Sequence, residues 1–193
     1  MGREFELKYR LSRKALAQIL EDFPGEWTSW EMETTYYDTP GRELGRLRWT
    51  LRRRYENGKS VCTVKTPAFG GGRGEWETEG DDILAAIPEL CKLGAPAEMP
   101  YFVRDGLEAV CGARFTRQAM TLQLEQCTVE LALDNGVLLG GGSEKRLCEL
   151  EVELKSGSEA AAAAYAKQLA HQYGLRPEKK SKYLRALALS AEG

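Results

Sequence analysis

The sequence predicts an α+β fold in which the strands form a closed or nearly closed sheet around a polar interior. Several predicted strands alternate strictly between charged and apolar residues, so each has one ionic face and one apolar face. Amphipathic helical segments lie between and after these strands and are available to cover the apolar faces. The ionic faces would then converge inside the sheet.

Length and composition favour a single domain over residues 1–193. The chain has 193 residues, of which 42% are hydrophobic and 29% are charged, which suits one well-packed domain. Its 27 basic and 29 acidic residues give a net charge of −2, and the lack of surplus base argues against a nucleic-acid partner.

The cysteines and the N-terminus predict a cytoplasmic protein. The five cysteines include no C-x-x-C pair, which is typical of reduced thiols and not of a disulfide framework or zinc site. The N-terminal residues are too charged for a signal peptide. No segment approaches membrane-spanning length, so we expect no membrane partner.

The first predicted strand covers residues 4–11, where every even position is charged and every odd position is apolar. Its charged residues are Glu4, Glu6, Lys8 and Arg10. Ser12 is a suitable N-cap for a helix over residues 13–23, and Pro24–Gly25 would end that helix.

Three further β segments follow. Residues 28–39 alternate as a strand does. Residues 45–67 predict a hairpin, because Asn57–Gly58 is a strong turn signal and both flanks are rich in β-forming residues. Residues 73–80 alternate again and predict another strand.

The middle and the end of the chain predict helices around further strands. Residues 81–94 and 100–112 indicate two short helices with breaks at Pro88 and Pro100. Residues 114–140 predict a strand segment that folds back and turns at Asn135–Gly136, and residues 147–157 predict a further strand. A helix is expected from Ser158, and a final helix within residues 177–190. The whole chain then has about eight strands.

Most predicted strands contribute to the ionic face. Two like charges about 4 Å apart repel by roughly 4 kcal/mol at an effective dielectric constant near 20, so the neighbouring acids need cations. Carboxylate oxygens hold hard divalent cations, and arginine and lysine bind phosphate oxygens, so a ligand with several phosphates would suit this face. Its members are Glu4, Glu6, Lys8, Arg10, Arg52, Arg54, Lys65, Arg73, Glu75, Glu77, Arg117, Asp134, Glu149, Glu151 and Glu153.

A series of motifs in chain order resembles the CYTH superfamily, whose members are also called triphosphate tunnel metalloenzymes. The series begins with E-x-E-x-K at residues 4–8. It continues with TLRRR at 50–54, TVKTP at 63–67, RGEWE at 73–77, FTR at 115–117, ELALD at 130–134, ELEVEL at 149–154 and KKSKYLR at 179–185.

The resemblance implies an eight-stranded antiparallel tunnel, flanked by helices, that hydrolyses or cyclises triphosphates with Mg²⁺ or Mn²⁺. In the two-metal mechanism one ion clamps the triphosphate and the other activates the attacking water. The implied metal ligands are Glu4, Glu6, Glu151 and Glu153, with Asp134 as a further ligand or as a hydrogen-bonding partner of the ligands. The implied catalytic residues are Glu4, Glu6, Lys8, Glu151 and Glu153. The implied substrate-binding residues are Lys8, Arg52, Arg54, Lys65, Arg73, Arg117 and Lys182, with Glu75 and Glu77 orienting the bases or holding the second ion.

Three positions depart from the family pattern or leave it open. Arg53 stands between the paired arginines where an apolar residue is usual, so it either reaches the surface at the strand end or marks a locally irregular strand. Phe115 replaces a base that often precedes the central arginine, with Arg114 available to compensate. Tyr36 is the expected tunnel cap, although Tyr37 is its neighbour.

The favoured activity is hydrolysis of inorganic triphosphate to pyrophosphate and phosphate by a monomer or homodimer. The ionic face has many phosphate-binding groups and no evident aromatic slot for a base. Adenylate cyclase and thiamine triphosphatase of the same fold stay open, since Trp27, Trp30 or Trp76 could stack a ring. A non-catalytic module that binds polyphosphate or nucleotide is the remaining alternative.

Overall fold

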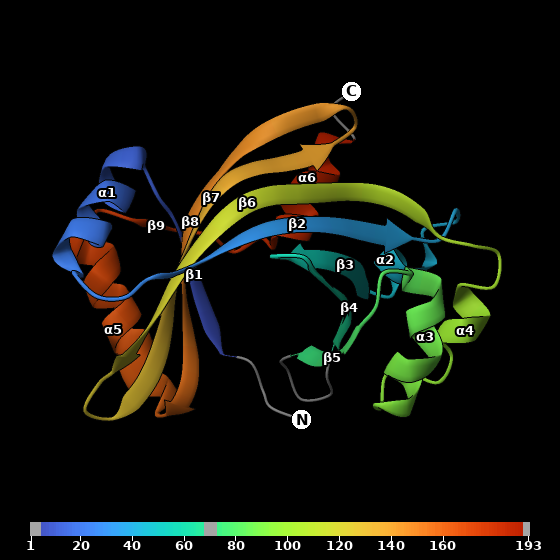
Figure 1. Cartoon of the computed structure of the whole chain (residues 1–193), viewed down its shortest axis with the longest axis horizontal. Coiled ribbons are helices and arrows are strands. Elements are labelled where there is room, and N and C mark those ends of the chain that lie inside the picture. The colour runs from blue at the N-terminus through green and yellow to red at the C-terminus, as the bar shows by residue number, and fades with distance from the viewer. Residues whose placement is uncertain (1–4, 68–72, 191–193) are drawn as a thin grey trace.

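The computed structural model describes residues 5–67 and 73–190, which form one antiparallel sheet with helices at its ends (Figure 1). The order of strands across the sheet is β5-β4-β3-β2-β6-β7-β8-β1-β9. The strands are β1 (Glu6–Arg10), β2 (Thr28–Asp38), β3 (Thr50–Glu56), β4 (Lys59–Pro67), β5 (Arg73–Glu79), β6 (Glu108–Gln123), β7 (Cys127–Gly140), β8 (Ser143–Gly157) and β9 (Arg176–Pro177).

The helices lie in three groups around the sheet. Figure 1 shows α1 and α5 together at one end and α3 and α4 at the other. No helix among the described residues is long and apolar enough to cross a membrane. The helices are α1 (Arg13–Asp22), α2 (Glu43–Arg46), α3 (Ile83–Lys92), α4 (Met99–Phe102), α5 (Glu159–Gln172) and α6 (Lys182–Leu189).

The predicted α+β class with an antiparallel sheet is confirmed. The described residues form nine strands instead of the expected eight, because the two-residue β9 pairs with β1. The strand pairings of the described residues run from β5 to β9 and include none between β5 and the β1–β9 edge. The long strands β6, β7 and β8 nevertheless curve strongly (Figure 1), which brings the two ends of the sheet towards one another.

Apolar clusters cover the outer face of the sheet, as the alternation predicts. Leu131, Leu150 and Val152 point away from the ionic face and pack with Ile19 of α1 and Ala166 of α5. A second cluster packs the helical region of α3 and α4 against β3 and β4. The core therefore lies outside the curved sheet, between the strands and the helices.

Helix α6 is placed differently, because it packs on the ionic side of the sheet. Its Ala186 and Leu189 contact Leu147 of β8. Leu147 lies two residues before Glu149 and therefore on the same face of its strand. This face is thus apolar at one end and ionic further along, and α6 covers the apolar end.

Several local predictions agree with the structure. Ser12 and Ser158 accept hydrogen bonds from backbone N–H groups three residues later and cap α1 and α5. Asn57 and Gly58 have φ angles of 47° and 86° and join β3 to β4, as their turn signal predicts.

The predicted turn at Asn135–Gly136 is wrong, because both residues lie inside β7 and pair with β6 and β8. The β7–β8 turn instead lies at Gly141–Gly142, where both φ angles are positive. A Cβ atom at position 136 would lie 2.1 Å from the Arg114 carbonyl oxygen. The glycine therefore permits a close approach of strands and does not make a turn.

The predicted helix break at Pro88 is also wrong. Pro88 lies inside α3. Proline removes a backbone donor there, but Ile87 and Leu90 on the same helix are almost fully buried. Packing of this apolar stripe keeps the helix intact. Pro100, in contrast, lies at the start of α4, where its missing N–H costs little.

Candidate active site: a charged cavity inside the sheet

A cavity of about 780 Å³ lies on the ionic side of the sheet. Its walls include Glu6 of β1 and Glu75 of β5, which stand near opposite ends of the strand order. The sheet therefore wraps around this space. The lining residues predicted from the sequence are Glu6, Lys8, Tyr36, Arg52, Arg54, Lys65, Glu75, Glu77, Arg117, Glu151, Glu153 and Lys182.

The cavity wall is close to electrically neutral. Among the described residues it carries seven acidic and seven basic side chains. The sequence analysis did not single out three of its charged members, namely Glu56, Glu130 and Lys155. Glu56 and Lys155 continue the alternation of β3 and β8, and Glu130 lies four residues before Asp134 in β7, so the period of two could have found them.

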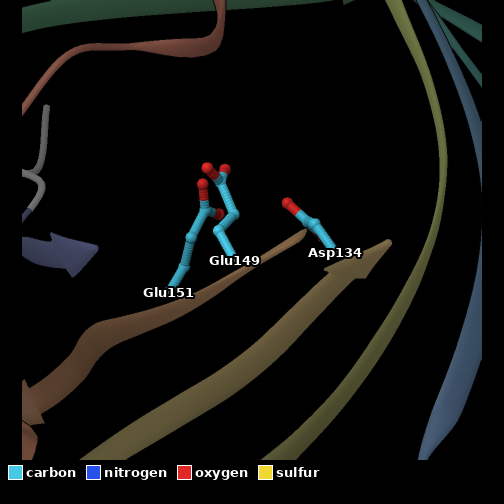
Figure 2. Close-up of side chains that lie close together, drawn as sticks. All are labelled: Asp134, Glu149 and Glu151. Carbon is cyan, nitrogen blue, oxygen red and sulfur yellow. The ribbon is translucent and has the colours of Figure 1, made fainter. Parts of the chain in front are cut away.

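Three buried carboxylates meet beside this cavity and form what we call the acid cluster: Asp134, Glu149 and Glu151, of which Glu151 lines the cavity. Their oxygens lie within 4.8 Å of one another, and Figure 2 shows them converging from β7 and β8. Asp134 and Glu149 have no solvent exposure. Glu149 was on the predicted ionic face but not among the predicted metal ligands. Spacing along a strand predicts which face a residue is on, but not how deeply it is buried.

Three cations surround the acid cluster. Arg117 donates two hydrogen bonds of 2.7 Å to Asp134 and a third to Glu151. The Lys182 ammonium lies 2.7 Å from Asp134, 2.6 Å from Glu151 and in contact with Glu149. Arg185, on the next turn of α6, pairs with Glu149. Helix α6 therefore delivers two of the three cations to acids on β7 and β8.

The paired charges shift the pKa values of these groups. Burial alone would raise the pKa of Glu151, but Lys182 and Arg117 outweigh it and hold that pKa well below the ordinary value. Burial alone would lower the pKa of Lys182, but Glu151, Asp134 and Glu149 raise it above the ordinary value. Glu151 and Lys182 are therefore charged together.

A row of three further carboxylates crosses the strands beside the acid cluster. Glu153 of β8 pairs in register with Glu6 on one side and with Glu130 on the other. Lys8 lies 3.1 Å from Glu6, and Lys155 lies 3.0 Å from Glu153 and 3.4 Å from Glu130. Each lysine thus offsets repulsion between directly opposed acids.

The opposite wall carries the predicted phosphate-binding bases. Glu75 lies 3.0 Å from Lys65 and 3.7 Å from Arg52, and Arg54 pairs with Glu56. The buried Nε of Arg52 has no hydrogen-bond acceptor among the described residues. A ligand oxygen in the cavity could satisfy that donor.

The residues at the positions that depart from the family pattern lie both inside and outside the cavity. Arg53 points away from the cavity, and its guanidinium donates to the Asp81 carbonyl at 3.0 Å. Arg114 is exposed and pairs with Glu144 on the outside, so it does not replace a base inside. Phe115 lines the cavity, with Lys182 5.2 Å above its ring.

The two tyrosines occupy different environments. Tyr36 lines the cavity and packs against Tyr183 with ring centroids 5.2 Å apart. Tyr37 instead packs against the apolar cluster below α3. Glu4 lies outside the described residues, and of Arg73 only the strand is described, so their predicted roles stay predictions.

Comparison with known proteins shows the family of this chain. The model of the CYTH domain matches residues 2–187. The chain belongs to the CYTH domain family.

A curated relative of this chain is the inorganic triphosphatase of Haemophilus influenzae. It is 28% identical over 173 residues, which cover 82% of this chain and 47% of the relative. The chain therefore spans about half the length of that protein.

Solved structures share the fold. A Hippeastrum adenylyl cyclase candidate, described as having a dominant triphosphatase activity, has a TM-score of 0.64 and 18% identity, covering 94% of this chain and 93% of that one. The PH1819 protein of Pyrococcus horikoshii has a TM-score of 0.61 and 24% identity over 96% of this chain and 98% of its own.

The acid cluster suits a divalent cation, the class of ion used by CYTH triphosphatases. Carboxylate oxygens are the donors that Mg²⁺ and Mn²⁺ prefer. A positive group, the ammonium of Lys182, already lies among the three carboxylates. The donor set and its attraction for a cation therefore fit a metal of this kind.

Proposed function

We propose that this protein hydrolyses inorganic triphosphate to pyrophosphate and phosphate with Mg²⁺ or Mn²⁺, by a mechanism that uses two ions. The observation that carries the proposal is one cavity that has a wall of bases and reaches the acid cluster through Glu151. The curated triphosphatase relative supports the same activity.

The neutral cavity favours a metal–triphosphate complex over either partner alone. A bare triphosphate would bring several negative charges into a wall whose acids and bases already balance. Divalent cations cancel much of that charge, so the complex enters with a smaller electrostatic cost. This reasoning supports joint binding of metal and substrate.

The bases would hold the phosphate chain from two sides. Arg52, Arg54 and Lys65 form one wall, and Lys8, Arg117 and Lys182 lie towards the acid cluster. Arginine forks and lysine ammonium groups both bind phosphate oxygens and stabilise charge that develops on them. Mg²⁺ or Mn²⁺, when bound to the carboxylates, would neutralise the chain and polarise its oxygens.

The reaction is a displacement at the terminal phosphorus. A water oxygen forms the new bond to phosphorus while the bridging P–O bond breaks, and pyrophosphate leaves with that electron pair. One water proton is released to a surrounding carboxylate or to solvent. The role of the cavity residues is to hold the chain in line and to stabilise the leaving group.

The decisive experiment offers the purified protein inorganic triphosphate, ATP or thiamine triphosphate with Mg²⁺, Mn²⁺ or a chelator. Phosphate, pyrophosphate and cyclic AMP are quantified. We expect metal-dependent release of phosphate and pyrophosphate, fastest from inorganic triphosphate. Tight binding of triphosphate without any product would instead indicate a non-catalytic module.

One observation favours a substrate that carries a ring. Of the three candidate tryptophans, Trp30 lines the cavity, close to Met32 and Phe115, whereas Trp27 and Trp76 pack in apolar clusters. An aromatic ring could stack on this patch. Cyclic AMP from ATP, or fastest turnover of thiamine triphosphate, would support this second candidate.

Substitution of the acids tests the site. We expect Glu151→Gln and Glu6→Gln to reduce metal-dependent turnover by at least about 100-fold, because each removes a negative charge that would hold the metal. Circular dichroism and thermal unfolding check that the variants fold. Unchanged rates in both folded variants would overturn the assignment.

A further inference from the structure

The Lys182 ammonium occupies the place among the carboxylates where a bound cation would lie. It contacts all three members of the acid cluster, and its side chain is only 12% exposed. A small positive group surrounded by carboxylate oxygens has the same electrostatic surroundings that a divalent cation requires.

The charge balance makes Lys182 and a metal alternatives. The three carboxylates of the acid cluster are already matched by three cations, Arg117, Lys182 and Arg185. A divalent ion added to this buried group would leave two positive charges in excess. Departure of the ammonium lowers that excess to one and also frees the oxygens it holds.

Of the three cations, Lys182 alone holds the acid cluster without a guanidinium group. Arg117 holds Asp134 with two parallel bonds of 2.7 Å, and Arg185 bridges Glu149 and Glu178. Lysine is a point charge on a flexible four-carbon chain without such a fork. Its neighbours Ser181 and Tyr183 also line the cavity, so the Lys182 side chain stands beside the space that a phosphate chain would fill.

We propose that Lys182 is a built-in competitor of the metal, which keeps the acid cluster closed until an anionic phosphate chain draws the ammonium away. This inference rests on the proposed function, because it takes a phosphate chain as the ligand. Metal binding at the acid cluster is then conditional on substrate. Without substrate, the apparent metal affinity equals the intrinsic affinity multiplied by the fraction of molecules in which the cluster is free of Lys182.

The test measures Mn²⁺ binding by electron paramagnetic resonance in protein without substrate. Lys182→Gln should bind Mn²⁺ at least about tenfold more tightly than the wild type, as expected if the cluster is free in fewer than about one molecule in ten. Lys180→Gln is the matched control, because it removes one exposed positive charge two residues away. Equal affinity in Lys182→Gln and wild type, or an equal gain in Lys180→Gln, would overturn the proposal.

A second variant keeps the test decisive if Lys182→Gln does not fold. Asp134→Asn should weaken Mn²⁺ binding strongly when a methylene-bridged triphosphate analogue is present and little when it is absent. Equal weakening in both conditions would contradict the competition. Both measurements are independent of turnover, so an inactive protein that shows these changes refutes the hydrolase and not the competition.

Discussion

At the scale of single residues, the run Arg52–Arg53–Arg54 shows that neighbouring arginines on one strand lie in different environments. Arg52 and Arg54 line the cavity, whereas Arg53 reaches the Asp81 carbonyl outside it. Burial and the charge of Arg52 lower the pKa of Arg54. Successive strand residues alternate between faces, so identical side chains take different roles.

This contrast predicts different effects of two neighbouring substitutions. Arg54→Ala should weaken binding of inorganic triphosphate by about 10- to 100-fold, because a charge-assisted bond to phosphate is lost. The loss should be smaller for pyrophosphate, since a shorter chain can stay near Lys8 and Lys182. Competition binding measures both, and Arg53→Ala is the control. A loss of equal size in Arg53→Ala would show that the wall of bases is wrongly assigned.

At the scale of elements, Glu178 links β1 to the segment that precedes α6. It accepts from Arg10 at 2.6 Å and from the Lys180 backbone N–H at 2.9 Å, while its own N–H donates to the Lys8 carbonyl at 2.8 Å. Its side chain is 2% exposed. The strand that carries Lys8 and the helix that carries Lys182 are therefore fixed to each other at this point.

The bonds to Glu178 also predict how stability depends on pH. Burial raises the pKa of Glu178, but the bonds from Arg10 and Lys180 and the charge of Arg185 outweigh it, so the pKa lies below its ordinary value of 4.5. A carboxylate with a lowered folded-state pKa stabilises the protein above its ordinary pKa. That contribution is lost as the pH falls through the folded-state value.

Glu178→Gln should therefore lower the free energy of unfolding by about 1–3 kcal/mol at neutral pH. The difference from wild type should shrink as the pH falls below about 4.5, where the wild-type carboxylate takes up a proton. Urea unfolding over a pH series measures this. Glu159→Gln, at the exposed start of α5, is the control. A difference that does not change with pH would contradict the charged pairing.

At the scale of the whole molecule, the sheet encloses balanced charges instead of a hydrophobic core. Seven acids and seven bases face one cavity among the described residues. The apolar residues that a core needs lie on the other face of the strands, under α1, α3 and α5. Most of the apolar packing therefore lies on the outside of the sheet, and apart from the cluster under α6 the inside of the sheet is available for ligand chemistry.

This balance predicts that metal and triphosphate strengthen each other's binding. Isothermal titration of a non-hydrolysable triphosphate analogue should show at least about tenfold tighter binding with Mg²⁺ than with chelator. Because such coupling is reciprocal, the analogue should raise metal affinity by the same factor. The same analogue affinity in both conditions would show that the basic wall alone binds the chain.

Much of the fold follows from local patterns in the sequence. The alternation in residues 6–10 places Glu6 and Lys8 on the cavity side, and the same rule places Arg52, Lys65 and Glu151 there. The caps at Ser12 and Ser158 begin their helices as expected. Each of these features depends on neighbours close in sequence, so a single sequence is enough to predict them.

Other features needed contacts between distant segments. Asn135–Gly136 has the residues of a turn, but the close approach of Arg114 makes the glycine part of a continuous strand. Glu149 and Glu153 lie on the same face of β8 but differ in burial, which alternation does not encode.

The sequence by itself determined the α+β class, the ionic face and its motifs, because periodicity and local turn chemistry act within a few residues. The tertiary structure alone decided which charges pair. Lys182 meets Asp134 and Glu151 across separations of dozens of residues, and only the docking of α6 onto the ionic side of the sheet brings them together. Charge pairing depends on distance in space, for which spacing along the chain is no measure.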